Sequence, residues 1–517
     1  MRPPRIVALA ALLSICVACG SGHARKLASL PNSTTKKSSS SLSFASFAAP
    51  VPAPAPVVAP VVAQAVVAPT ESPVVQTTET VAPQPAEGPQ SAPKETPAPE
   101  PVATPEPVQP EPAKIEEPAK ADEPAKAEEP AKAEEPAKAE APAPTYGLAG
   151  GWGGVRGYLL EHGFTIDFSV TYEMNSVLSG GVREETSAHA LYDLTSSFDL
   201  DRIAGWKDAQ LSFEAYVTSG HNPSENVGDF QSFSNISAVE VAQIAQVFYE
   251  QWFGEHVWRL KLGKMDANSD FGAPANGAES IHSASAFSPT CFTMVTYPNP
   301  ATGIIAGWVP NEHWSLNVGM YDGAAMAGVN TGSVGPASFF GDPPGFFYIG
   351  ELGHRWKAGT SELVGGATLG AWHHTGDFDN NSGGTTHGTT GFYGTLDQEL
   401  SRAAEGQSGG TKSIFLQLGF ADPDVAPSDR HLGAGFHWAG CCSARPDDAL
   451  GVYISSLHFS DGAGFTASSE TAYELSYTCQ CCSGVTLRPD LQYITSPGGD
   501  ASLDDALVFS LRLELGF

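Results

Sequence analysis

The feature that most constrains the fold of this chain is a strict two-residue alternation in its last segment, ALVFSLRLELGF, at residues 506–517. In an extended strand, residues two apart lie on the same face. One face of this segment therefore carries Leu507, Phe509, Leu511, Leu513, Leu515 and Phe517, and the other carries Val508, Ser510, Arg512, Glu514 and Gly516. Such a strand either covers a buried layer or belongs to a membrane barrel, with its apolar face toward lipid.

Fifteen further segments have strand character, beginning with TIDFSVTYEM, in which Ile166, Phe168, Val170 and Tyr172 alternate with polar residues. The others lie near residues 190–200, 210–218, 241–253, 257–265, 302–309, 315–321, 346–356, 367–374, 392–400, 413–420, 432–438, 451–459, 472–478 and 486–495. The total of sixteen is even, as a closed antiparallel barrel with both chain ends on one side of a membrane requires.

The connections between these segments alternate in length. Short ones such as AGWKD, FGEH and VPNEHW are typical of periplasmic turns, whereas those at residues 220–240, 266–301, 322–345 and 376–391 are expected to be external loops. A water-soluble all-β domain, the alternative, would not show this alternation. No later window is apolar for the ~20 residues of a transmembrane helix, so a membrane span here must be a barrel. We therefore predict an all-β, sixteen-stranded antiparallel transmembrane β-barrel over residues 146–517.

The N-terminus indicates export. Arg2 and Arg5 precede an apolar run at residues 6–17 that is too short to span a bilayer and is followed by small residues. We interpret residues 1–24 as a secretory signal peptide. Cys19 stands where a lipoprotein signal carries its lipidated cysteine, so lipidation of Cys19 and plain cleavage near residues 18–24 are the alternatives.

A second region, residues 25–145, is dominated by Ala, Pro, Val, Ser and Glu and ends in the tandem repeat EEPAKA DEPAKA EEPAKA EEPAKA. Regular proline breaks helices and sheets, and the region has few aromatic residues with which to form a core. We predict a disordered periplasmic spacer. It acts either as a passive linker or as a tether to peptidoglycan.

The net charge argues against one class of partner. Residues 1–145 hold 16 of the 57 acids and 12 of the 27 bases, so residues 146–517 carry 41 − 15 = 26 net negative charges. Such an acidic domain is not expected to bind nucleic acid.

Several motifs from residue 146 onward are specific enough to indicate a family: GGWGGVRGYLLEHGF, YEQWF, LKLGKMDANSDF, FFYIGELGHRW, LGAWHHTGDFDN, RPDDALGV, and LRPDLQYITSPGG followed by ALVFSLRLELGF. Together they resemble the carbohydrate-selective porin family of the OprB type. The resemblance implies a sixteen-stranded barrel in the outer membrane of a Gram-negative-type bacterium, surrounded by lipid and passing small sugars by diffusion. It also implies that Phe517 is the terminal aromatic residue read by the barrel-assembly machinery.

A sugar-selective pore needs charged or amide side chains across a narrow, water-filled site. Because Trp258, Leu260 and Leu262 are apolar and alternate with Arg259 and Lys261, the latter two are expected to face the lumen. The same argument turns Glu250, Glu351, Arg355, Arg488, Asp490 and Gln492 inward.

The loop at residues 266–301 is expected to fold into the lumen, as such loops commonly do in sixteen-stranded porins. It follows Lys261 and Lys264 directly, so Lys264, Asp266, Asn268 and Asp270 are further constriction candidates. We expect the bases to oppose the acids across the pore. For each residue alone, a solvated wall charge is the alternative to a ligand contact. Lys261 lies where the family commonly has Arg. Lysine lacks the planar guanidinium group that makes paired hydrogen bonds, so the sugar preference here is expected to differ from that of the family.

The sequence offers little support for an enzyme: it has no HExxH and no phosphate loop. Neighbours in a strand point to opposite faces, so His373 and His374 are not expected to hold a metal together. We predict neither an enzyme nor a cofactor.

Five cysteines lie in two connections, with Cys441 and Cys442 in one and Cys479, Cys481 and Cys482 in the other. Counting strands back from the C-terminus makes both connections periplasmic turns two strand spacings, ~10 Å, apart. In an oxidising compartment we expect a disulfide between the turns. Thiols and a thiolate metal site are the alternatives.

The sequence is compatible with three functions: a sugar-selective passive porin, a cation-preferring or general diffusion channel of the same fold, and a structural anchor joined to the cell wall through the spacer. The acidic excess suggests the second and the spacer suggests the third.

Overall fold

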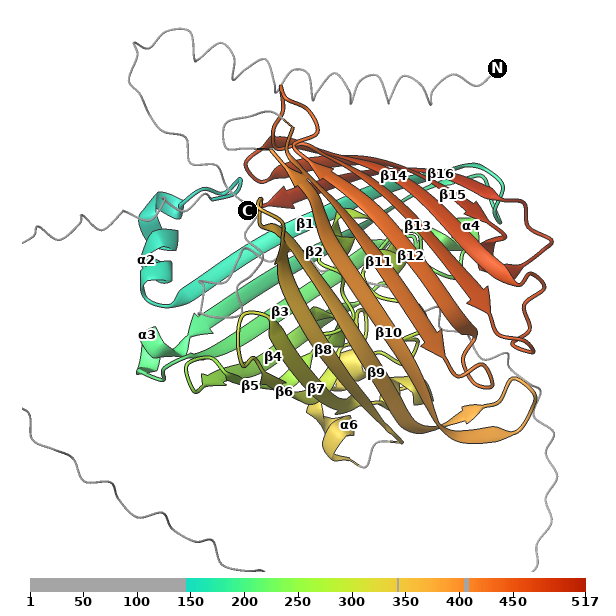
Figure 1. Ribbon diagram of the computed structural model, residues 1–517, viewed down its shortest axis with the longest axis horizontal. Helices are drawn as coiled ribbons and strands as arrows, with labels where there is room; N and C mark the ends of the chain where they lie inside the picture. The colour runs from blue at the N-terminus through green and yellow to red at the C-terminus, as the bar shows by residue number, and fades with distance from the viewer. Residues whose placement is uncertain (1–145, 342–343, 404–408) are drawn as a thin grey trace, which may run out of the picture. The chain divides into compact units, whose positions relative to one another are not determined.

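The computed structural model describes residues 146–517 except 342–343 and 404–408. The predicted signal peptide, Cys19 and the spacer lie outside the described residues. Sixteen strands form one closed antiparallel barrel in which each strand pairs with its neighbours in sequence and β1 pairs with β16 (Figure 1). The predicted fold class is confirmed.

The strands are β1 Phe164–Ser179, β2 Thr186–Asp199, β3 Ala209–Gly220, β4 Ala242–Phe253, β5 Trp258–Met265, β6 Ala301–Trp308, β7 Trp314–Asp322, β8 Phe346–Ala358, β9 Leu363–Asp379, β10 Thr385–Arg402, β11 Thr411–Ala421, β12 Ser428–Ala439, β13 Ala449–Phe459, β14 Ser469–Cys482, β15 Val485–Thr495 and β16 Ala506–Gly516. All sixteen predicted segments correspond to strands. We call the end of the barrel that carries the chain terminus the turn end, and the opposite end the loop end.

The alternation in the sequence becomes a polar inside and an apolar outside. In β16, Val508, Ser510 and Arg512 are buried, while Phe509 and Leu511 between them are partly exposed. On the outer face Leu369 is 70% exposed and Leu432 is 52% exposed. An outer surface of leucine and valine over a buried polar interior is the arrangement of a barrel in lipid.

One predicted external loop is mostly strand. Residues 376–391 extend the β9–β10 hairpin, and only residues 380–384 form the turn between the two strands. Asn380 accepts the backbone N–H of Ser382 at 2.9 Å, and Gly383 and Gly384 have φ of 95° and 94°. These residues supply turn chemistry that allows the strands to continue up to it.

Short helices lie outside the strands: α2 Val155–Glu161, α3 Leu200–Ala204, α4 Ser224–Val227, α5 Thr331–Val334 and α6 Pro336–Phe340. Short 3₁₀ turns occur at residues 152–154, 267–269, 277–279, 283–285, 324–327 and 497–499. No helix among the described residues is long and apolar enough to cross a membrane. Arg156 of α2 donates to the carbonyl of Phe517 at 2.9 Å, so the segment before β1 contacts the end of β16.

Candidate constriction of the lumen

Loop 3, defined as residues 266–300, folds into the barrel, as the sequence predicts. Its Phe271, Phe287 and Met294 are buried in one apolar cluster with wall residues such as Trp372 and Tyr393. The loop thus has a core of its own, formed against the inner wall between β5 and β10.

Wall carboxylates hold this loop by accepting its backbone N–H groups. Glu351 on β8 accepts from Gly272 at 2.7 Å. Asp397 on β10 accepts from Ala275 and Asn276, both at 2.9 Å. Glu474 on β14 accepts from Ile281 at 2.8 Å. Because buried backbone N–H groups need hydrogen-bond acceptors, these three wall side chains fix the path of the loop across the lumen.

Loop 2, defined as residues 221–241, also folds inward, a course that the sequence did not predict. Glu470 on β14 accepts from the N–H groups of Phe230 at 2.8 Å and Gln231 at 3.0 Å. The two loops meet where the N–H of Asn235 donates to the carbonyl of Ile281 at 2.8 Å. Polar wall side chains therefore give the backbone of loop 2 partners inside the barrel.

Four predicted residues form one ion-paired network on the wall formed by β4 and β5. Arg259 Nη2 lies 2.9 Å from Glu250 Oε2, and Arg259 Nη1 lies 2.6 Å from Asp270 Oδ1. Lys261 Nζ lies 2.8 Å from Asp270 Oδ2. Two aromatic rings adjoin the cations: the ring centroid of Phe248 is 3.9 Å from Lys261 Nζ, and that of Trp252 is 5.8 Å from Arg259 Cζ.

The charge on Asp270 follows from this setting. Burial by itself raises the pKa of the Asp270 carboxyl, but the positive charges of Arg259 and Lys261 outweigh burial and hold this pKa well below its ordinary value. Asp270 is therefore ionised across the physiological pH range.

The expected opposition of bases and acids across the pore is corrected by this geometry. Arg259 and Glu250 lie on adjacent strands, and Asp270 reaches the same wall from loop 3. Alternation in the sequence specifies the face on which a side chain lies, but not which residue of the adjacent strand lies beside it. Residues that pair on one wall were therefore predicted to oppose each other across the pore.

Lys264 does not join this network. Its ammonium donates to the carbonyls of Ile244 and Gly332, beneath α5 at the loop end. Gly263, just before it, has a φ of 138°, and Lys264 pairs with Val247, which is exposed on the outer face. Lys264 thus lies on the outward face of β5, with Trp258, Leu260 and Leu262.

Asp266 and Asn268 shape the loop. Asp266 accepts the N–H groups of Asn268 at 2.8 Å and Tyr297 at 3.2 Å, which joins the beginning of loop 3 to its end. Asn268 donates to the carbonyls of Phe271 at 3.1 Å and Ala286 at 3.3 Å. The side chains of Asp266 and Asn268 thus form hydrogen bonds with other residues of loop 3.

The remaining predicted residues lie on other walls. Arg488 on β15 donates to the carbonyl of Glu279 at 3.1 Å and lies 3.8 Å from Glu514. Asp490 accepts from Gln492 at 3.0 Å. Arg355 on β8 lines a cavity together with Glu351 and Asp270.

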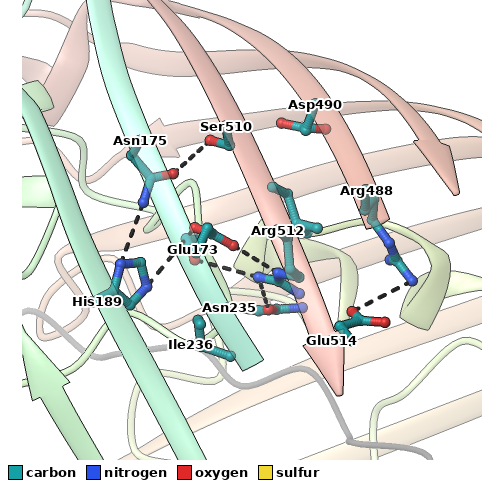
Figure 2. Close-up of polar contacts among 12 residues, drawn as sticks. Glu173, Asn175, His189, Asn235, Ile236, Arg488, Asp490, Ser510, Arg512 and Glu514 are labelled. Carbon is teal, nitrogen blue, oxygen red and sulfur yellow. Dashed lines mark hydrogen bonds and ion pairs between the residues drawn. The ribbon is translucent and has the colours of Figure 1, made fainter. Parts of the chain in front are cut away.

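A buried polar cluster at the β1–β16 pair was missed (Figure 2). Arg512 Nε donates to Glu173 Oε2 at 2.6 Å, and Arg512 Nη2 donates to Asn235 Oδ1 of loop 2 at 2.7 Å. His189 Nε2 lies 3.8 Å from Glu173 Oε1. Arg512 stands on the polar side of the alternation at residues 506–517, and Glu173 stands on the polar side of TIDFSVTYEM, so the sequence carried the signal.

The two cysteine-rich turns contact each other, but through an arginine. Arg445 Nη2 lies 3.1 Å from Cys479 Sγ and 3.1 Å from the carbonyl of Gln480. The Sγ atoms of Cys479 and Cys481, in the same turn, are 3.6 Å apart. The disulfide pairing Cys441 or Cys442 with Cys479, Cys481 or Cys482 stays a prediction, and Arg445 with its partner Asp448 lies at the junction between the two turns.

The two adjacent histidines lie on opposite faces of β9, as expected. His374 is buried and donates to the carbonyl of Gly323 at 2.9 Å, and exposed His373 contacts Thr390 Oγ1 at 2.9 Å. Each imidazole thus has a hydrogen-bond partner on its own face of the strand.

A closed sixteen-stranded barrel with an apolar outer face and a loop folded into a polar lumen defines a porin. The family described as "Carbohydrate-selective porin, OprB family" matches residues 184–517, and the chain belongs to this family. Porin B of Pseudomonas aeruginosa is 24% identical over 418 residues, which cover 70% of this chain and 89% of that protein.

Two solved structures of Pseudomonas putida OprB share the fold. The high-pH structure has a TM-score of 0.65 at 20% identity, and the low-pH structure has a TM-score of 0.50 at 18% identity. Each comparison covers 72% of this chain and 99% of the other. The family and the barrel indicate a channel rather than an enzyme, and the porin relatives imply an outer-membrane location.

Proposed function

We propose that this chain is a passive outer-membrane channel that selects small carbohydrates. The observation that carries the proposal is the network of Glu250, Arg259, Lys261 and Asp270 beside the rings of Phe248 and Trp252, at the wall where loop 3 crosses the lumen. A pyranose presents hydroxyl groups that donate and accept hydrogen bonds, together with apolar ring faces. Charged groups next to aromatic rings complement both features.

Passage requires that the sugar also leave the site. The charged side chains of the network are already paired with one another. A sugar hydroxyl therefore forms hydrogen bonds with side chains whose charges are already balanced. Net hydrogen bonds to charged groups contribute about 1.5–3 kcal/mol each. One or two of them give millimolar affinity, about −4 kcal/mol, which is compatible with release.

Swelling of proteoliposomes tests selectivity directly. Vesicles that contain the full chain should swell faster in isosmotic glucose than in an amino acid of similar size, whereas vesicles with a general porin should swell at rates ordered by size alone. Equal rates for sugar and amino acid would contradict the proposal.

A cation-preferring channel is the second candidate, because residues 146–517 carry 26 more acids than bases. Many of these acids are at the loop end, for example Asp422, Asp424 and Asp461. Acids around an entrance attract cations without selecting a sugar. Strong cation selectivity in a salt gradient, without sugar-dependent current, would favour this candidate.

For residues 25–145 we propose a periplasmic location and, as the sharper alternative to a passive linker, contact with peptidoglycan. Deletion of residues 52–143 should abolish co-sedimentation of the barrel with peptidoglycan. Unchanged sedimentation would leave the passive linker.

A further inference from the structure

A hollow lies in the lumen wall beside the first part of loop 3, toward the turn end. Its volume is about 240 Å³, and it is lined by β7, β8, β9, β10 and residues 268–275 of the loop. We call it the wall chamber.

Strand register explains why the wall recedes there. Three adjacent rows of side chains share the inner face: Asn317, Glu351, Gly370 and Tyr393; Ser315, Gly353, Thr368 and Thr395; Arg355, Gly366 and Asp397. Apart from Tyr393, every residue in these rows is glycine or has a polar side chain. Gly353 and Gly366 lie between longer side chains, and the absence of a side chain at these two positions leaves the hollow.

The lining offers both kinds of hydrogen-bonding group. The hydroxyls of Thr368 and Thr395 lie 2.8 Å apart, so either is able to donate or to accept. Glu351 and Asp397 accept backbone N–H groups from loop 3, but a carboxylate has about four acceptor positions, so capacity for a ligand hydroxyl remains.

The opposite side of the wall chamber is less polar. Phe271 and Ala273 of loop 3 line it there. Asp270, which also lines it, is the residue that Arg259 and Lys261 hold in the charged network. The wall chamber therefore adjoins the proposed selectivity site through Asp270.

We propose that the wall chamber is a second carbohydrate-binding site, which takes one sugar ring between the charged network and the turn end. The proposal rests on the proposed function, because it assumes that sugars pass through this lumen. Polar rows of hydroxyl, amide and carboxylate groups bind ring hydroxyls, while Phe271 and Ala273 cover an apolar face of the ring. A molecule in transit thus exchanges one set of hydrogen bonds for another.

Two glycines provide a matched test. A Cβ added at Gly366 meets nothing closer than the carbonyl oxygen of His354 at 3.6 Å, and one added at Gly350 meets nothing closer than the carbonyl oxygen of Asn317 at 3.8 Å. Neither has a positive φ. Gly366 faces the wall chamber, whereas Gly350 pairs with Val318, which is 51% exposed on the outer face. Gly366→Leu should therefore fill the site, and Gly350→Leu should leave it open.

The experiment is block of single-channel ion current by glucose in planar bilayers, with the full chain. Gly366→Leu should weaken the block about tenfold or more, while Gly350→Leu should match the wild type. Thr395→Val, which replaces a hydroxyl by a methyl of similar size, should weaken the block about threefold, and it covers the case in which Gly366→Leu does not assemble.

The outcomes separate the two proposals. If wild-type current is blocked by glucose but Gly366→Leu and Thr395→Val are blocked as well as wild type, the wall chamber binds no sugar and the proposed function stands. If Gly350→Leu weakens the block as much as Gly366→Leu, the effect comes from strand distortion and the inference is overturned. If wild-type current ignores every sugar, the proposed function itself fails.

Discussion

Arg259 Nη1 of β5 lies 2.6 Å from Asp270 Oδ1, so a buried ion pair joins the barrel wall to the loop that crosses the lumen. The same carboxylate also pairs with Lys261 at 2.8 Å. Because one acid lies between two bases, it both fixes loop 3 and balances the local charge.

Neutralising that acid should release the loop. Asp270→Asn leaves Arg259 and Lys261 close together without their shared partner, and breaking a buried pair costs about 3–5 kcal/mol. We expect a shift of the reversal potential toward anion selectivity in a salt gradient and faster proteolysis within residues 266–300. Glu362→Gln is the control, since its contact with Lys357 is exposed at 3.9 Å and should contribute little. Unchanged selectivity in Asp270→Asn would exclude a role for this acid in setting the charge of the pore.

The β1–β16 closure depends on a second buried pair. Glu173 is opposite Arg512 in the strand register and is fully buried. Arg512→Met should leave an unpaired carboxylate, costing about 3–5 kcal/mol, and lower the temperature at which the barrel loses its heat-modifiable gel shift. Glu514→Gln is the control, because its contact with Arg488 is longer, at 3.8 Å, and partly exposed. Equal melting of the two variants would show that the Glu173–Arg512 pair is dispensable.

Loop 2 should pack less firmly as the pH rises. Burial, and then the charge of Glu470, raise the pKa of Asp229 to about 7. In the packed loop Asp229 therefore keeps a proton that it releases from about pH 4 upward when the loop is open. The free energy that favours packing is thus greatest at low pH and decreases as the pH rises to about 7. Hydrogen exchange of the amides at residues 230–233, corrected for intrinsic rates, should be more protected at pH 5.5 than at pH 8.

The matched variant is Asp229→Asn, which keeps an acceptor for the N–H of Phe233 but does not titrate. It should reduce the difference between the two pH values, whereas Asp461→Asn, in an exposed position, should preserve it. An undiminished difference in Asp229→Asn would assign the pH effect to another group.

Alternation in the sequence was sufficient to predict the barrel, because strand faces depend on a local two-residue period. It correctly turned Lys261 inward and Trp258 outward, since neither inference needs a partner strand. The contact between Arg259 and Glu250 needs the register of two strands, which alternation does not specify.

The inward course of loop 2 was beyond the same reasoning. Its polar residues are those expected of an exposed loop, and their partners, Glu470 and Arg512, are more than two hundred residues further along the chain. Only barrel closure brings these groups together. The cysteine-rich turns were correctly predicted to be neighbours from strand counting, but the position of Arg445 between them depends on side-chain packing.

Sugar-dependent block of ion current tests the central claim most directly. The full chain in a planar bilayer should show a saturable decrease in conductance with a mono- or disaccharide, half complete at millimolar concentration, about −4 kcal/mol. Lys261→Met keeps the aliphatic stem near Phe248 but removes a donor to the site, so it should weaken this block about tenfold or more, because 1.4 kcal/mol is a factor of ten. The same variant should be more cation-selective, because a positive charge leaves the lumen. Wild-type current that is unaffected by every sugar tested, together with strong cation selectivity, would contradict carbohydrate selection and favour the cation-preferring channel.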